Sequence, residues 1–197
     1  TAYRYLTCVL IKDDKILASY YDVAKVTAVT YSNGKTTIQI SPVYGLNSSL
    51  NSIVINDDSV EDGDVLLTVE DEKGNALELS NIRKGNIIAF AVAPGQSGTY
   101  TDPAFIDIKV TEETATGKVT ARDDDEKTYT VDGTDYAISK TKWDDKFLEI
   151  GSSYELVLDP FGRIFSAEIV AASEKFAGAK VVERCNSRGN KNFFTRC

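Results

Sequence analysis

The chain has 197 residues, of which 42% are hydrophobic, 10% aromatic and 26% charged, a composition typical of a folded protein with room for one to three small domains. It contains no histidine, which excludes Ser-His-Asp and Cys-His nucleophilic sites and metal sites built on imidazole. The formal net charge of −8 has the wrong sign for a surface that neutralises phosphate groups, so we expect no nucleic-acid partner. The longest apolar runs are too short for membrane insertion.

Alternation of apolar and polar residues predicts half-buried β-strands along most of the chain. Short turn sequences with Gly, Asn or Asp separate these strands, which favours antiparallel hairpins. The clearest alternating segments are Val65-Leu67-Val69, Ile106-Ile108-Val110, Tyr154-Leu156-Leu158 and Phe165-Ala167-Ile169. We therefore predict an all-β fold made of tandem small antiparallel β-barrel or β-sandwich modules with one short helix.

Residues 1–21 are the first predicted element, a strand followed by a polar turn and a return strand. Cys-Val-Leu at residues 8–10 and Lys-Ile-Leu at residues 15–17 match Leu-Val-Leu at residues 156–158 and Arg-Ile-Phe at residues 163–165 without a gap. The later pair closes a module, so we interpret residues 1–21 as the closing hairpin of a preceding unit.

Two copies of one β-module are predicted next, over residues 22–115 and 116–172. Lys-Val-Thr-Ala at residues 25–28 recurs at residues 118–121, and a turn and a strand follow each copy. A third and weaker copy starts at Lys180, so residues 173–197 are interpreted as the opening hairpin of a further unit. The first module is the longer one, and we place its insertion around residues 41–60.

The second module allows a prediction about its core and its helix. The alternation predicts that one core holds Val119, Tyr129, Val131, Tyr136, Ile138, Leu156, Leu158 and Ile164. Residues 140–150 place Trp143, Phe147 and Leu148 at helical spacing, which predicts the short helix. We expect Trp143 to pack in the core there, because large aromatic residues on such a face are usually buried.

The second module also resembles β-modules that are repeated in surface proteins of clostridia-like bacteria, which often carry S-layer homology domains. The resemblance covers residues 118–171 and depends on the Asp132-Gly133 turn, Tyr136-Ala-Ile138, a strand led by Gly151 and the Gly162-Arg-Ile164 return. It implies an extracellular, wall-associated structural protein at a bacterial cell surface. It supplies no catalytic residue.

The half-units at the two ends of the chain provide the candidate assembly residues. Each has an unpaired sheet edge, so we expect residues 6–17 to pair with residues 181–195, within one molecule or between copies. Residues 173–197 carry a charge of +4 and the rest of the chain −12, which favours such contact. In an oxidising environment Cys8 could lock the joint with Cys185 or Cys197.

Carboxylates cluster in residues 56–64, and oxygen-rich loops are typical of calcium sites. The EF-hand pattern fails there, because counting from Asp58 puts Val60 and Val69 where ligands are needed. We therefore expect no cofactor and no metal. The weak calcium candidates are Asp57, Asp58, Asp62 and Asp64.

We predict a non-catalytic structural or assembly module of an S-layer-like surface protein, with copies of itself or neighbouring surface domains as partners. The alternative is a glycan-binding or calcium-dependent adhesive module, for which cell-wall glycan is the partner. The aromatic candidates for a sugar platform lie at strand ends or in loops. They are Tyr20, Tyr21, Tyr44 and Tyr100.

Overall fold

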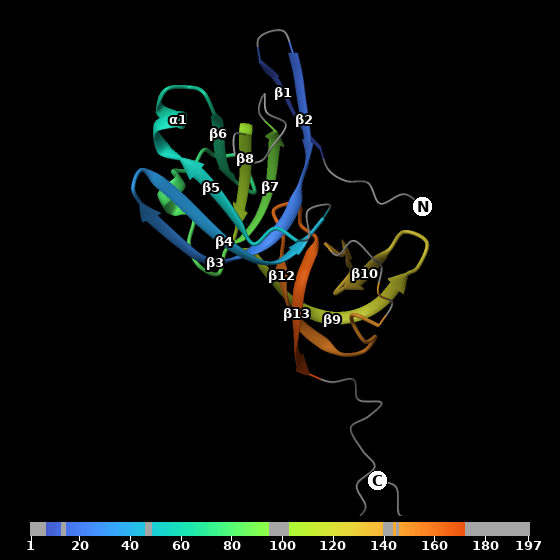
Figure 1. Cartoon of the computed structure of the whole chain (residues 1–197). Coiled ribbons are helices and arrows are strands. Elements are labelled where there is room, and N and C mark those ends of the chain that lie inside the picture. Colours follow the sequence, from blue (N-terminus) through green and yellow to red (C-terminus); the bar gives the residue numbers. More distant parts are fainter. Residues whose placement is uncertain are drawn as a thin grey trace, which may run out of the picture.

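The computed structural model describes residues 7–12, 15–45, 49–94, 103–139, 144 and 146–171 of the chain. β-Strands dominate these residues and form a two-stranded, a five-stranded and a six-stranded sheet (Figure 1). The helical elements are the short helix α1 (Asp57–Glu61) and the 3-10 turn η1 (Leu79–Asn81). The predicted all-β fold class is confirmed. No helix in the described part of the chain is long and apolar enough to cross a membrane.

The six-stranded sheet curls around its own hydrophobic core and forms the first barrel. Its strands, in spatial order, are β5 (Ser52–Asn56), β4 (Lys35–Tyr44), β3 (Asp22–Ser32), β7 (Ile87–Pro94), β8 (Pro103–Thr111) and β6 (Leu66–Asp71). Neighbouring strands are antiparallel except β6 and β8, which are parallel. Every strand contributes to the core, which includes Val26, Ile38, Ile55, Val69, Phe90 and Ile108.

The five-stranded sheet forms the second barrel. Its spatial order is β11 (Thr134–Ala137), β10 (Thr128–Val131), β9 (Thr114–Asp123), β12 (Ser153–Leu158) and β13 (Ile164–Ala171). A parallel bridge joins Ile138 to Ile164, and the Ser139 N–H donates to the Ile164 carbonyl at 2.9 Å, so the two outer strands meet. The five strands therefore close into a small barrel.

The two barrels have the same connectivity. In both, the first strand of the unit lies in the centre of the sheet, between the second and the fourth, so β3, β4, β5, β7 and β8 correspond to β9, β10, β11, β12 and β13. The strand β6 has no counterpart. Residues 57–86 between β5 and β7 are twice as long as the corresponding residues 138–152, and β4 and its connection to β5 are longer as well. The predicted insertion at residues 41–60 was therefore partly wrong. It includes β5, whose sequence has diverged from β11 although the two strands occupy the same place.

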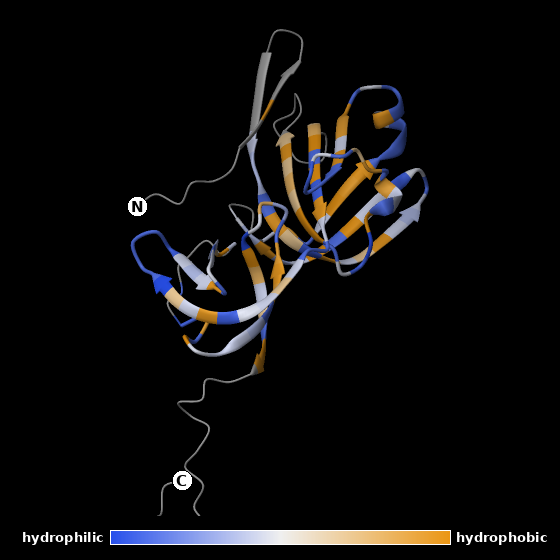
Figure 2. Cartoon of the chain, turned by 180° about the vertical axis from the view of Figure 1, so that it is seen from behind, coloured by the Kyte–Doolittle hydropathy of each residue, from blue (hydrophilic) through white to orange (hydrophobic). Residues whose placement is uncertain are grey.

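The predicted core of the second barrel is confirmed. Seven of its eight residues are buried in one cluster with Leu148, and Tyr136 packs against that cluster half-buried. The hydrophobic residues line the strands while the hairpin ends are hydrophilic, as Figure 2 shows. Period-two alternation therefore identified the inward face correctly wherever the strands run without interruption.

Residues 140–150 do not contain the predicted helix in their described part, Asp144 and residues 146–150, which form turns. The Asp144 carboxylate accepts the Lys146 N–H at 3.1 Å, and the Asp144 carbonyl accepts the Tyr129 hydroxyl at 2.5 Å. The Asp144 carbonyl also accepts the Phe147 N–H at 3.1 Å, a bond from residue i+3 that is typical of a turn. Trp143 lies outside the described residues.

The strands β1 (Thr7–Lys12) and β2 (Lys15–Tyr20) form a separate antiparallel hairpin that projects from the barrels (Figure 1). The Ser19 hydroxyl at its base donates to the Val92 carbonyl of β7 at 2.9 Å. Val9 on β1 is 59% exposed. Residues 173–197, including the segment predicted to pair with this hairpin, lie outside the described residues.

Candidate functional site

An apolar interface joins the two barrels and brings together strands that are far apart in the sequence. Val23, Ile87 and Ala89 of the first barrel are buried against Phe165 of β13. These residues lie on the outward faces of their strands, because the opposite faces fill the separate cores of the two barrels. The interface therefore joins the two barrels through residues that neither core uses.

Aromatic rings surround this interface. Tyr21 meets Phe161 edge-on with ring centroids 5.2 Å apart, and Tyr44 lies against Phe165 at 5.0 Å. Arg163 places its guanidinium 5.3 Å from the centre of the Phe161 ring. Burial raises the pKa of the Tyr44 hydroxyl. Such ring pairs add to the stabilisation from area burial alone.

A β-bulge in β13 supplies Phe165 to the interface. Leu158 pairs with Ile164 and Val157 with Ser166, so Phe165 is the extra residue. Ile164 consequently points into the second core while Phe165 points toward the first barrel. The prediction that Phe165 shares a face with Ala167 and Ile169 was wrong for this reason, since one extra residue reverses the alternation.

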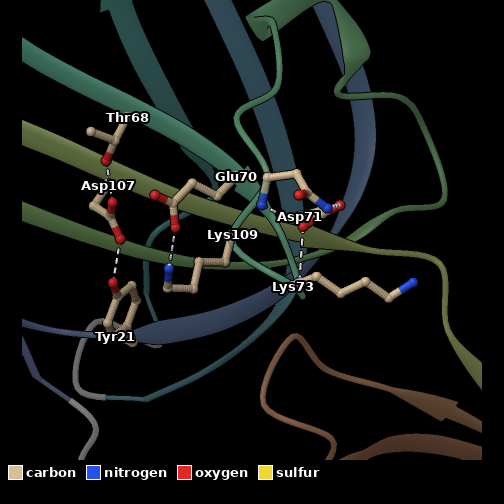
Figure 3. A network of polar contacts seen from close by, with 8 residues as sticks. Tyr21, Thr68, Glu70, Asp71, Lys73, Asp107 and Lys109 are labelled. Atoms are coloured by element: carbon tan, nitrogen blue, oxygen red, sulfur yellow. Dashed lines mark hydrogen bonds and ion pairs between the residues drawn. The ribbon is translucent and has the colours of Figure 1, made fainter.

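A network of polar contacts continues from the interface along β6 and β8 (Figure 3). The Tyr21 hydroxyl and the Thr68 hydroxyl donate to the two oxygens of the Asp107 carboxylate, which is 8% exposed. Beside it Lys109 binds Glu70 at 2.7 Å. The parallel register of β6 and β8 sets Thr68 opposite Asp107 and Glu70 opposite Lys109. The inserted strand β6 therefore satisfies a buried acid that would otherwise be costly.

A second buried carboxylate, Asp159, organises the turn between β12 and β13. Its oxygens accept the Ser139 hydroxyl at 2.5 Å, the Arg163 Nε–H at 2.7 Å and the N–H groups of Phe161 and Arg163 at 2.9 and 3.0 Å. Ser139 follows the bridge that closes the second barrel. Asp159 thus links the β12–β13 turn to the closure, and its bonds have a structural purpose.

A groove of about 470 Å³ runs beside the ends of β6 and β8. Asn86 is buried at its base, donates to Glu112 at 2.6 Å and accepts the Arg83 N–H at 2.6 Å. The Asn86 side chain is therefore committed to the fold.

The calcium candidates lie at the start of the insertion. Asp57 and Asp58 occupy the first turn of α1, and Asp62 follows its last turn. The Asp57 carboxylate accepts the Thr36 hydroxyl at 3.2 Å. Throughout the described ranges, no three or more Asp, Glu, Cys or His side chains are grouped in a way that could hold a metal ion.

The remaining candidate residues are scattered. Cys8 lies in β1 opposite Ser19, whereas Cys185, Cys197 and Tyr100 lie outside the described residues. Of the tyrosines expected at the surface, Tyr20 is 49% exposed. Tyr21 and Tyr44 are half-buried in the interface between the barrels, so the expectation that they are exposed was wrong. Clusters of aromatic residues near β-turns, such as those at residues 20–21 and 161–165, were the available signal for that interface.

No protein-family model, no curated protein and no solved structure matches the chain.

Proposed function

We propose that the chain is a non-catalytic structural module of an extracellular bacterial surface assembly and joins copies of itself by strand complementation. The observation that carries this proposal is the packing of two barrels with one connectivity through an apolar, aromatic interface. In repeat arrays each unit is stabilised by its contact with the next unit, and an interface of this kind would supply that contact. The surface location follows from the resemblance of the second module.

The ends of the chain supply the joining elements. The hairpin β1–β2 pairs with no other described strand, and a lone two-stranded sheet is only marginally stable in water. Residues 173–197 are basic, and the remainder of the chain is acidic. Opposite charges bring the tail of one copy to the body of another, and Cys8, Cys185 and Cys197 are available to lock the joint.

Sedimentation velocity of the full chain and of a chain lacking residues 173–197 tests this function. We expect concentration-dependent association of the full chain and its loss on deletion, with unchanged circular dichroism for the barrels. The variant with Cys8, Cys185 and Cys197 all replaced by Ser separates strand pairing from disulfide formation and should still associate. If the full and shortened chains both sediment as monomers of equal stability, the proposed function is wrong.

A further inference from the structure

The first barrel is open where the second is closed. In the second barrel the outer strands meet at Ile138 and Ile164. In the first barrel β8 pairs with β6 instead, and the other edge of β6 is covered by its own return, because the Leu77 N–H donates to the Val69 carbonyl at 2.8 Å. The strand β5 is left at the end of the sheet, so an open seam remains between β5 and β6 in the described structure.

The free edge of β5 has backbone groups available for pairing. The Asp57 N–H donates to the Gly34 carbonyl and the Ile40 N–H to the Asn51 carbonyl. These two bonds fix which residues of β5 are hydrogen-bonded to β4 and which point their backbone groups outward. In this hydrogen-bonding pattern the N–H and C=O groups of Ser52, Val54 and Asn56 point away from β4. Among the outer strands of the described sheets, β5 is the one without a charged residue, and charges normally protect such edges.

Two depressions lie along the same seam. One of about 330 Å³ separates Ile55 of β5 from Leu67 and Val69 of β6. A smaller one of about 40 Å³ lies at the other end of β5, between Ile53 and Phe90. Side chains of an added strand that point toward the barrel would enter these depressions, as in other cases of strand addition.

The rim of the larger depression is acidic. Asp57, Glu61 and Glu78 line it, and the described residues place no Lys or Arg among its lining. A basic extended segment therefore fits this edge better than an acidic one.

We propose that the β5 edge accepts residues 180–184 of a second copy of this chain as an added strand. This segment, Lys-Val-Val-Glu-Arg, has two adjacent valines, so one apolar side chain faces the barrel in either register. Lys180 and Arg184 outweigh the single acid Glu183, so the segment carries a net charge of +1 toward the acidic rim. The proposal rests on the proposed function and identifies the acceptor edge for its tail.

A second copy is the occupant because of where the tail begins. The chain leaves β13 at the end of the second barrel that lies away from the first, whereas the seam belongs to the first barrel (Figure 1). A contact between different surfaces of two copies is heterologous, so repeated addition produces a ring or a filament.

The variant Val54→Pro tests the acceptor edge in the full chain. Proline removes the outward N–H of Val54 and leaves the ladder with β4 intact, which edge strands tolerate. The matched control Val54→Thr keeps the N–H and the branched shape. We expect self-association, measured by sedimentation velocity, to weaken at least tenfold in Val54→Pro and to stay within twofold in Val54→Thr, with both variants melting as the unaltered chain does.

A synthetic peptide of residues 178–197, with serine in place of both cysteines, provides a second readout. An excess of this peptide should dissociate assemblies of the full chain, and the same peptide with Val181→Asp and Val182→Asp should not. Unchanged association of Val54→Pro, or competition by both peptides alike, overturns the seam as acceptor while the proposed function stands. A full chain that remains monomeric at every concentration overturns both.

Discussion

The two barrels share a strand order but differ in how they close. The five-stranded barrel closes on itself through the Ile138–Ile164 bridge, which Asp159 supports through Ser139. The six-stranded barrel contains the extra strand β6, which pairs with β8 and leaves β5 unpaired on its outer edge. An inserted strand has therefore changed the edge of one repeat without changing its core connectivity. Repeats of this kind can differ in binding surface while keeping one fold.

The outward faces of the barrels differ as well. On the first barrel, β6 covers Asp107 with Thr68, while Tyr21 reaches the same carboxylate from the base of the hairpin. On the second barrel, the bulge in β13 turns Phe165 outward against the first barrel. One unit therefore uses an insertion and the other a bulge to build contacts outside its own core.

Replacement of Phe165 by Ala should have the largest effect on the coupled unfolding of the two barrels. Phe165 is 2% exposed, so its truncation should lower the free energy of unfolding by about 3–5 kcal/mol. Because Phe165 belongs to the interface, chemical denaturation followed by fluorescence should change from one transition into two.

The contrasting variant is Leu156→Ala, which removes a fully buried side chain from the second core. It should cost about 2–5 kcal/mol and lower the stability of the second barrel without separating the transitions as Phe165→Ala does. A single transition for Phe165→Ala, at the midpoint of the unaltered chain, would show that the barrels are not coupled through this interface.

A smaller effect is expected at the position where the repeats differ by one methyl group. Gly117 of β9 corresponds to Ala24 of β3, which is fully buried. A Cβ at Gly117 would lie 2.6 Å from the Asp132 Oδ2 atom and 2.7 Å from Val131 Cγ1. Gly117→Ala should therefore cost about 1–3 kcal/mol in a denaturation experiment.

The reciprocal replacement Ala24→Gly is the control for this position. It creates no clash, and its cost should come from greater backbone freedom and the loss of a buried methyl group, about 1 kcal/mol. Equal stability of Gly117→Ala and the unaltered chain would mean that the two repeats tolerate the same side chain there.

The smallest effect concerns the acidic turns, one in each repeat. The Asn75 side chain and backbone N–H lower the pKa of Asp71, and the Glu126 and Asp125 N–H groups lower the pKa of Asp123. The folded pKa is depressed in both cases, so the stabilisation is present above the unfolded pKa and is lost as pH falls through the folded pKa. Carboxyl NMR titration should place both midpoints below the ordinary value for Asp. A midpoint at or above that value for either residue would contradict the turn geometry.

The sequence by itself determined the all-β class, the two equivalent Lys-Val-Thr-Ala strands and the core of the second barrel. These features depend on local periodicity, because alternation states which side chains of a strand share a face. The match between residues 25–28 and 118–121 likewise placed equivalent strands, β3 and β9, at the centre of both sheets. The corresponding strands β5 and β11 could not be matched, since their sequences share no such signature.

Only the tertiary structure decided what each face meets. Phe165 faces the first barrel because a bulge interrupts the alternation of β13, and Asp107 is buried because β6 and Tyr21 supply its partners. The described part of the predicted helix is a turn, and Tyr129 donates to the Asp144 carbonyl from 15 residues away. Periodicity encodes that a face is buried, but the partner that buries it comes from long-range packing, which a single sequence does not display.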